Sequence, residues 1–213
     1  MTIYTPSSFA VSDRAAIARL MHDYPFATLV TPSAAEPDVS HLPLLFVDGD
    51  EPHGTLLGHM ARANPHWEHA AGVESIAIFH GPHAYVSPSW YAEPSKAVPT
   101  WNYAAIHAHG TLDIIRDPVE TRGVLDALVQ RFEASREAPW QFAMPEAQRD
   151  ALVGAIVAFR LRIRTLTAKF KLSQNRPPAD QLRVAAALDN EGYADAAAVA
   201  AWMRAYAGGT SGG

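Results

Sequence analysis

The order of the β-prone runs is the feature that most constrains the fold of this chain. Short apolar runs bounded by turn residues recur along most of the sequence, and a brief helical pattern opened by Asn64-Pro65 interrupts them. The expected strands are 26–30, 40–47, 55–59, 75–79, 84–86, 104–115 and 159–170. A doubly wound parallel sheet would need a helix between successive strands, and that alternation is missing. The pattern therefore predicts an α+β fold, an antiparallel barrel with peripheral and C-terminal helices.

Helical spacing and turn signals complete this prediction. Helices are expected at 13–22, just after Asn64-Pro65, and at 119–134, 146–156, 180–188 and 195–206. Asp48-Gly49-Asp50 is typical of a hairpin, Gly81-Pro82 is expected to end a strand, and 88–99 is expected to be a loop. We expect a barrel domain over 1–176, a helical extension over 177–207 and a flexible tail over 208–213.

Composition excludes several classes of protein. The 213 residues include no cysteine, which excludes disulfides, thiolate metal ligands and thiol catalysis. The formal net charge of −5 does not support general binding to DNA phosphates, although DNA contact through a local patch stays open. No apolar run approaches the roughly 20 residues of a membrane span, and no secretory signal pattern is visible. We expect a soluble, cytoplasmic protein without membrane contact.

The segment from Gly81 to Gly110 has an unusual density of aromatic residues and proline. It contains the motifs AYVSPSWY and VPTWNYAAIHAHG, with the motif GHMARANPHW before it and the motif KFKLSQNR after it. By composition alone these aromatics indicate core or interface contacts. Together these four motifs resemble those of the PaiB-like family of FMN-binding negative transcriptional regulators. The resemblance extends from Tyr4 to about Leu188, which is nearly the whole chain.

The resemblance implies a fold, a cofactor and a function. It implies an FMN-binding split barrel, usually a homodimer with two flavin sites at the subunit interface, and a role in repressing sporulation and degradative-enzyme genes. It implies no catalytic residue. Two alternatives stay open: a flavin-dependent oxidoreductase that acts on a small molecule, and a ligand-binding dimer with a degenerate flavin pocket, which could take a related planar ligand.

The resemblance also places the FMN site. A bound FMN needs donors for its phosphate and a flat apolar slot for its ring. Arg62 precedes a helix start, where phosphate is attracted, so it is the expected phosphate clamp. Lys171 and the amides beside it suit the phosphate or the polar ring edge. The expected cofactor residues are His41, Leu42, Pro43, His59, Arg62, Ala63, Asn64, Trp90, Trp101, Asn102, Tyr103, Lys171, Gln174 and Asn175.

Each of these residues also has an interpretation without a ligand. Arg62 could be a surface cation with Asn64 as a plain helix cap, and the residues near Lys171 could tie a strand end to its neighbour. Ala168 stands where the family usually has glycine before the lysine of this motif, so close approach of a ligand is in doubt there.

Other motifs are weaker. His66 and His69 share one helix face and His107 and His109 one strand face, but two ligands at short spacing indicate ordinary histidines more often than a metal site or haem. The ladder formed by Arg160, Arg162 and Arg164 could touch DNA, but such ladders more often pair with carboxylates. The last helix, 195–206, is mostly alanine and matches a groove-reading helix poorly. Nucleophile-elbow, Walker and GxGxxG motifs are absent from the sequence.

Overall fold

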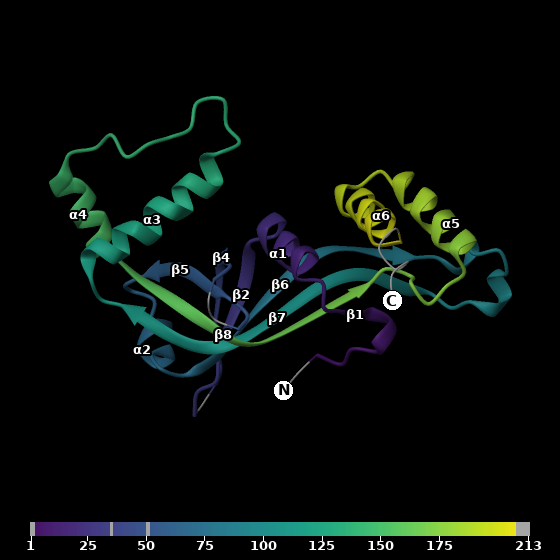
Figure 1. Cartoon of the computed structure of the whole chain (residues 1–213), viewed down its shortest axis with the longest axis horizontal. Helices are drawn as coiled ribbons and strands as arrows, with labels where there is room; N and C mark the ends of the chain where they lie inside the picture. The colour runs from purple at the N-terminus through teal and green to yellow at the C-terminus, as the bar shows by residue number, and fades with distance from the viewer. Residues whose placement is uncertain (1–2, 35, 50–51, 208–213) are drawn as a thin grey trace. The chain divides into compact units, whose positions relative to one another are not determined.

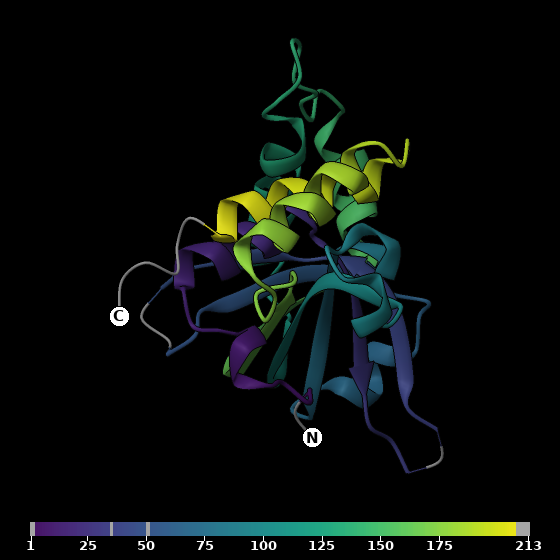
Figure 2. The ribbon, with the colours of Figure 1, turned by 90° about the vertical axis from the view of Figure 1, so that its right-hand side faces the viewer.

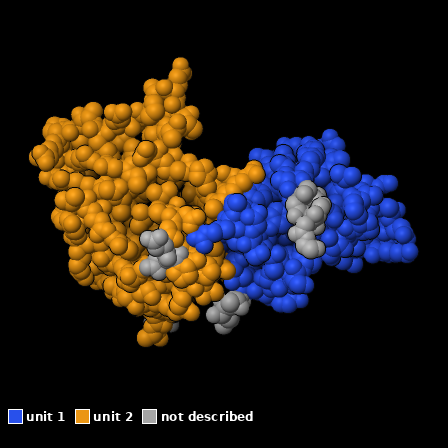
Figure 3. All heavy atoms as spheres, in the orientation of Figure 1, with its two compact units in different colours: residues 1–17, 80–106, 167–213 blue, residues 18–79, 107–166 orange. Residues whose placement is uncertain are grey.

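The computed structural model describes residues 3–34, 36–49 and 52–207. They form two compact units, which Figure 3 distinguishes by colour. The terminal unit comprises 1–17, 80–106 and 167–213, and the central unit comprises 18–79 and 107–166. Three of the four boundaries between the units fall inside long strands and the fourth falls inside a helix, so each unit draws on segments that lie far apart in the sequence. The expected tail at 208–213 lies outside the described residues.

The described residues form eight strands and six α-helices (Figure 1). The strands are β1 (Ala10–Val11), β2 (Phe26–Thr31), β3 (Asp38–Pro43), β4 (Leu45–Val47), β5 (Thr55–Ala61), β6 (Glu74–Val86), β7 (Thr100–Ile115) and β8 (Ile156–Lys171). The α-helices are α1 (Arg14–Asp23), α2 (His66–Ala70), α3 (Pro118–Glu133), α4 (Glu146–Gly154), α5 (Pro178–Asp189) and α6 (Ala194–Ala207). Three short 3-10 helices are η1 (Ser7–Phe9), η2 (Pro88–Trp90) and η3 (Pro94–Lys96).

The strands form one antiparallel sheet in the order β3-β2-β6-β7-β8-β5-β4, with β1 paired to β8 outside this path. The sheet is not closed, because β3 and β4 end the path on opposite sides. This confirms the predicted α+β class, the antiparallel sheet and the helices around it. The hairpin predicted at Asp48-Gly49-Asp50 agrees with the antiparallel pairing of β4 with β5, in which Val47 lies opposite Thr55; Asp50 itself lies outside the described residues.

Two strand predictions were wrong in their boundaries. The expected strand 40–47 is divided into β3 and β4 at Leu44, whose side chain is fully buried and whose N–H donates to the Pro25 carbonyl at 2.9 Å. The expected strands 75–79 and 84–86 are one continuous strand, β6. Gly81 and Pro82 are both buried there, so the alternation of buried residues changes phase without ending the strand, as at a bulge.

The central unit packs apolar side chains of β2, β5, β7 and β8 against one another. Phe159 and Leu161 of β8 are fully buried. A Cβ atom at Gly58 would lie 2.6 Å from Leu44 Cδ2, and one at Gly110 would collide with the backbone carbonyl of Arg162. Both strands therefore need glycine for close packing. Helix α3 covers part of the sheet through a cluster formed by Leu45, Leu57, Ile115, Val124, Leu128 and Ala158.

The terminal unit has its own apolar core, built where the helical hairpin α5–α6 packs on the ends of the long strands. The two helices lie side by side, drawn in yellow and yellow-green in Figure 2. Phe170 of β8 is fully buried and contacts the rings of Trp202 and Tyr206 edge to face, at centroid distances of 5.4 and 5.3 Å. Such contacts add to the stabilisation from buried area.

The arginine ladder of β8 is paired with carboxylates. Arg160 pairs with Glu120, Arg162 with Asp113 and Arg164 with Glu74. This agrees with the expectation that such a ladder faces carboxylates of neighbouring elements. In the part of the chain that the structure describes, no helix is long and apolar enough to cross a membrane.

Candidate cofactor-binding site

The predicted cofactor residues fall into two sets, one in each unit. The central unit carries His41, Leu42, Pro43, His59, Arg62, Ala63 and Asn64. The terminal unit carries Trp90, Trp101, Asn102, Tyr103, Lys171, Gln174 and Asn175. The two sets are described separately, with the hydrogen bonds that their polar side chains form to other residues of the chain.

A small cavity of about 130 Å³ lies in the terminal unit, and three predicted residues line it. We call it the Lys171 cavity. Its polar lining residues are Thr100, Asn102, Lys171, Ser173, Asn175 and Arg176. Phe9, Tyr91 and Val98 complete its lining. The start of β7, the end of β8 and the turn after β8 thus bring together residues about 70 positions apart.

Lys171 is the central cation of this cavity. Its Nζ donates to Thr100 Oγ1 and to the carbonyl of Trp101, each at 2.6 Å. Burial, together with the nearby charges of Lys169 and Arg176, lowers the pKa of Lys171 below the ordinary lysine value. No aspartate or glutamate is among the residues described that line the cavity. The site is thus cationic without a compensating carboxylate.

Lys169 and Arg176, the two neighbouring cations, are held by aromatic rings. Lys169 Nζ donates to the Tyr4 carbonyl at 2.8 Å and lies 5.4 Å from the centroid of the Tyr103 ring. The guanidinium carbon of Arg176 lies 4.8 Å from the centroid of Tyr91, which is buried. These contacts orient the two cations, and neither cation forms an ion pair with a carboxylate among the described residues.

The turn after β8 is held by its own amides. Ser173 adopts a positive φ of 67°, and the Gln174 side chain accepts from the Leu172 N–H at 2.7 Å and donates to the Phe170 carbonyl. Asn102 Nδ2 donates to Ser173 Oγ at 2.9 Å. Gln174 therefore already uses both ends of its amide inside the turn, and its role toward a ligand stays a prediction.

The aromatic residues predicted for the site do not share one position. Alternation along β7 puts Trp101 and Tyr103 on one face and Thr100 and Asn102 on the other. Trp101 is 53% exposed and lies near His83 and Tyr85, with ring centroids 6.3 and 6.1 Å away. Trp90 ends η2 and does not line the Lys171 cavity.

Ala168 occupies a covered stretch of β8. It is 3% exposed and pairs with Val11 of β1. Strand β1 therefore covers the backbone at the position where the family usually has glycine. The Lys171 cavity lies further along β8, so the replacement at Ala168 does not narrow it.

Arg62, in the central unit, uses two of its donors within the fold. Its Nε and Nη2 donate to the carbonyls of Gly154 and Ile156, at 2.6 and 2.7 Å. Trp67 Nε1 donates in turn to the Arg62 carbonyl at 3.0 Å. Arg62 therefore holds the β5–α2 loop to the junction between α4 and β8. Its predicted role as a phosphate clamp remains a prediction.

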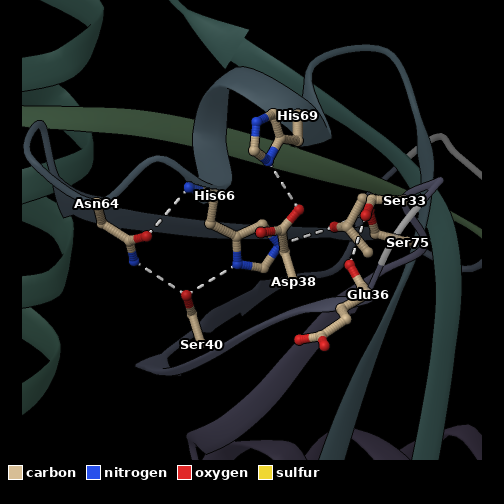
Figure 4. Close-up of polar contacts among 9 residues, drawn as sticks. Ser33, Glu36, Asp38, Ser40, Asn64, His66, His69 and Ser75 are labelled. Carbon is tan, nitrogen blue, oxygen red and sulfur yellow. Dashed lines mark hydrogen bonds and ion pairs between the residues drawn. The ribbon is translucent and has the colours of Figure 1, made fainter.

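Asn64 belongs to a buried polar network around His66 (Figure 4). His66 is 2% exposed. Its Nδ1 lies 2.8 Å from Ser40 Oγ and its Nε2 lies 2.9 Å from Thr31 Oγ1. Asn64 Nδ2 donates to Ser40 Oγ at 3.0 Å, while Asn64 Oδ1 accepts from the His66 N–H at 3.1 Å. Asn64 thus caps α2, a helix of only five residues, and burial lowers the pKa of His66.

His41, Leu42, Pro43, Ala63 and His59 complete the central set. His41 is exposed, with Nδ1 3.1 Å from Thr28 Oγ1. Leu42 and Pro43 are half-buried, and Ala63 is exposed. His59 is half-buried in β5, and its Nδ1 is a buried atom without a hydrogen-bond partner among the described residues. Strand β3 contacts both β5 and α2, so these residues lie on neighbouring elements.

The predicted histidine pairs have separate partners. His66 contacts Ser40 and Thr31, whereas His69 Nδ1 lies 3.0 Å from Asp38. The rings of His107 and His109 are 6.5 Å apart. Among the residues that the structure describes, no group of three or more histidine, aspartate or glutamate side chains could hold a metal ion.

Sequence reasoning missed several residues of the Lys171 cavity. Arg176 lies in the motif KFKLSQNR, so its charge was visible, but nothing local indicated that it shares a cavity with Thr100. Ser173 belongs to the same stretch, 169–176, which the resemblance offers as a possible part of the flavin site, whereas Tyr91 was noted only as part of the aromatic segment.

Comparisons with known proteins place the chain in a family. Residues 3–165 match the model of a family described as "Putative FMN-binding domain". The chain is 35% identical over 192 residues to "Protease synthase and sporulation protein PAI 2" of Bacillus subtilis, covering 89% of this chain and 90% of the relative.

Two solved structures have a similar fold. The FAD and heme binding protein from Mycobacterium smegmatis matches with a TM-score of 0.60 and 19% identity, over 81% of this chain and 78% of the other. The flavocytochrome Anf3 from Azotobacter vinelandii matches with a TM-score of 0.62 and 15% identity, over 81% and 74%. These two neighbours share the fold of the chain, and the FMN cofactor is supported by the family match. The chain belongs to the PaiB-like family of FMN-binding split-barrel proteins.

Proposed function

We propose that this chain is a homodimeric FMN-binding protein that acts as a negative transcriptional regulator, and that the Lys171 cavity holds the phosphate of the flavin. The observation that carries the proposal is a half-buried lysine in a cavity without a carboxylate, inside a chain of an FMN-binding family. Burying a cation without a counter-charge is costly. A bound phosphate would remove that cost.

The chemistry of the cavity fits a phosphate group. Lys171 offers ammonium donors, Arg176 a planar fork, and Thr100 and Asn175 neutral polar groups. A volume of about 130 Å³ admits a phosphate but not a three-ring isoalloxazine. Arg62 and Lys171 each donate to two partners within the fold, but Lys171 lies in a cavity without an acidic lining residue among those described, so the terminal unit is the stronger candidate for the phosphate.

The ring of the flavin needs a flat apolar surface. Tyr85, Trp101 and Tyr103 supply aromatic area in the same unit, and Trp101 is more than half exposed. The Trp101 carbonyl accepts from Lys171, whereas the Trp101 ring lies on the face of β7 opposite the cavity-lining Thr100 and Asn102. FMN, when bound, supplies the capacity to accept and donate electrons, while the chain supplies binding and orientation. Tyr85, Trp101 and Tyr103 are proposed as ring walls on this basis.

The dimer and the regulatory role rest on different support. Exposed apolar side chains such as Phe26, at 66%, and Val98, at 67%, favour surfaces that a second copy would cover. The regulatory role rests on the family resemblance and on the name of the Bacillus subtilis relative. The net charge of −5 does not favour broad DNA contact, so regulation through a partner or a small patch fits better.

FMN titration followed by quenching of flavin fluorescence tests the phosphate site. We expect Lys171→Met to raise the Kd for FMN by about thirtyfold, because a charge-assisted contact is worth roughly 1.5–3 kcal/mol. Lys96→Met is the matched control, since Lys96 is an exposed lysine of the same unit that pairs with Glu93. Absence of FMN binding by the native chain would refute the cofactor. An unchanged Kd in Lys171→Met would refute only the phosphate position.

Two further measurements test assembly and regulation. Sedimentation equilibrium should give twice the chain mass of 23.1 kDa, and a monomer at micromolar concentration would contradict the dimer. Deleting the encoding gene should raise transcripts of a defined set of genes, and re-expression should lower them again. Unchanged transcript levels would contradict the regulatory role while leaving FMN binding intact.

A further inference from the structure

The proposed function leaves a large cavity of the central unit unused. It has a volume of about 540 Å³ and lies where α3 and α4 meet the ends of β7 and β8. We call it the α3–α4 cavity. All of its lining residues belong to the central unit. Cavities of 300–1,000 Å³ are the usual size of small-molecule sites.

The charged residues of this cavity are mostly arginines. Arg62, Arg116 and Arg122 line it, and Asp150 is the one acidic residue among its described lining. Arg122 pairs with Asp150, which leaves an excess of two positive charges. Arg116 is exposed and forms no ion pair within the part of the chain that the structure describes. The charge of the cavity therefore favours an anion.

Arg122 has an unsatisfied donor in addition. Its Nη2 donates to Asp150, but its Nε is buried and has no hydrogen-bond partner among the described residues. A buried donor without a partner destabilises the fold. An arginine fork prefers the planar, two-oxygen geometry of a carboxylate. A ligand carboxylate at Arg122 would satisfy the free donor.

The walls of the cavity are apolar. Trp67, Ile114, Val153, Ile156 and Val157 contribute to them. An inorganic anion would leave these side chains without contact, whereas a flat hydrocarbon body would cover them. Burial of apolar area is worth roughly 25 cal/mol per Å². The ligand that suits both the walls and the arginines is an organic carboxylate with an aromatic body of about two rings.

We propose that the α3–α4 cavity is a binding site for a small aromatic carboxylate, separate from the flavin site. The proposal does not depend on FMN binding, because none of its residues lines the Lys171 cavity. The carboxylate contacts Arg122 and Arg116, and the aromatic body lies against the apolar wall. Arg62 stays with its two carbonyl partners and supplies charge at the edge of the site.

Isothermal titration calorimetry with 2-naphthoate tests the charge and the body of the ligand together. We expect a Kd in the micromolar range for 2-naphthoate and binding at least tenfold weaker for 2-naphthalenemethanol, which lacks the charge, and for acetate, which lacks the rings. Equal binding of the neutral alcohol would overturn the anion site. In ¹H–¹⁵N spectra, 2-naphthoate should shift the Nε–H signal of Arg122, and an unmoved signal would place the ligand elsewhere.

Two variants locate the site. Arg122→Gln should raise the Kd for 2-naphthoate about tenfold, but it also removes the pair with Asp150. Gly154→Leu keeps every charge and fills the cavity, because a Cβ at Gly154 meets nothing within 4 Å. Gly123→Leu is the matched control, a helical glycine of α3 with equal free space that does not line the cavity. Loss of binding in Gly154→Leu with retention in Gly123→Leu supports the site, and equal Kd values in both overturn it.

Competition with FMN decides whether the site is separate. We expect saturating FMN to leave the Kd for 2-naphthoate unchanged within about twofold. Displacement of 2-naphthoate by FMN would show that the α3–α4 cavity belongs to the flavin site, and the separate site would be refuted. A chain that binds 2-naphthoate but no FMN would refute the proposed cofactor while leaving this site standing.

Discussion

The Lys171 cavity and the α3–α4 cavity are both lined by cations, yet they differ in everything else that selects a ligand. The Lys171 cavity holds about 130 Å³, has six polar residues among the nine described that line it, and lacks an acidic one among them. The α3–α4 cavity holds about 540 Å³, has apolar walls and contains Asp150 beside three arginines. Positive charge alone therefore does not define a ligand. Size and wall chemistry favour a compact dianion in one and an amphipathic monoanion in the other.

Charge reversal in the smaller cavity should separate the two sites most strongly. Lys171→Glu puts a carboxylate opposite the flavin phosphate, so we expect the Kd for FMN to rise by at least a hundredfold. The Kd for 2-naphthoate should stay within twofold of the native value, because Lys171 does not line the α3–α4 cavity. Fluorescence titration measures the Kd for FMN, and calorimetry measures the Kd for 2-naphthoate. A parallel loss of both ligands, together with a lower melting temperature, would mean that the variant is unfolded.

Low pH is expected to lower the stability of the central unit. Burial lowers the pKa of His59, His66 and His109, and all three belong to this unit. Because the folded pKa of His66 lies below the unfolded value of about 6.5, the unfolded state binds its proton first as pH falls. Stability is therefore complete above about pH 6.5 and is lost below it, by at most about 1.4 kcal/mol per pH unit for each histidine.

Urea unfolding at pH 7.5 and 5.5 measures this effect. His66→Gln should reduce the loss of stability between the two values, since an amide can still bond Ser40 and Thr31 without titrating. His22→Gln is the control, because His22 is exposed and pairs only with Asp23 among the ion pairs described. An equal pH dependence in the native chain and in His66→Gln would contradict the role assigned to His66.

High pH is expected to change the stability of the terminal unit and its affinity for FMN. The folded pKa of Lys171 is lowered, so the folded chain releases this proton at a lower pH than the unfolded chain does. The free energy of unfolding therefore gains a contribution as pH rises from the lowered value toward about 10.4. FMN binding changes in the opposite direction, because the neutral amine no longer attracts phosphate. We expect the Kd for FMN to rise as alkali removes the Lys171 proton, and Lys171→Met to remove this dependence.

The same contrast explains what the sequence could predict. The antiparallel sheet followed from runs such as 26–30 and 159–170, whose boundaries are local properties. Lys171 and Asn175 were predicted from a motif and do line a cavity. Arg122 was not predicted, because α3 has the pattern of an ordinary amphipathic helix and its buried Nε arises only when α4 packs beside it. Arg62 was predicted as a phosphate clamp, but its carbonyl partners lie more than 90 residues away.

The smallest expected effect concerns Arg116, which distinguishes charge from contact in the α3–α4 cavity. Arg116 is exposed, so solvent screens its charge and its long side chain loses freedom when it contacts a ligand. We expect Arg116→Gln to raise the Kd for 2-naphthoate about threefold at low salt and by less in 0.5 M NaCl. The effect of Arg122→Gln should persist in salt, because its Nε is buried. If 0.5 M NaCl abolished the increase in Kd for both variants, the α3–α4 cavity would attract carboxylates only at long range. The proposal of a specific binding site would then be contradicted.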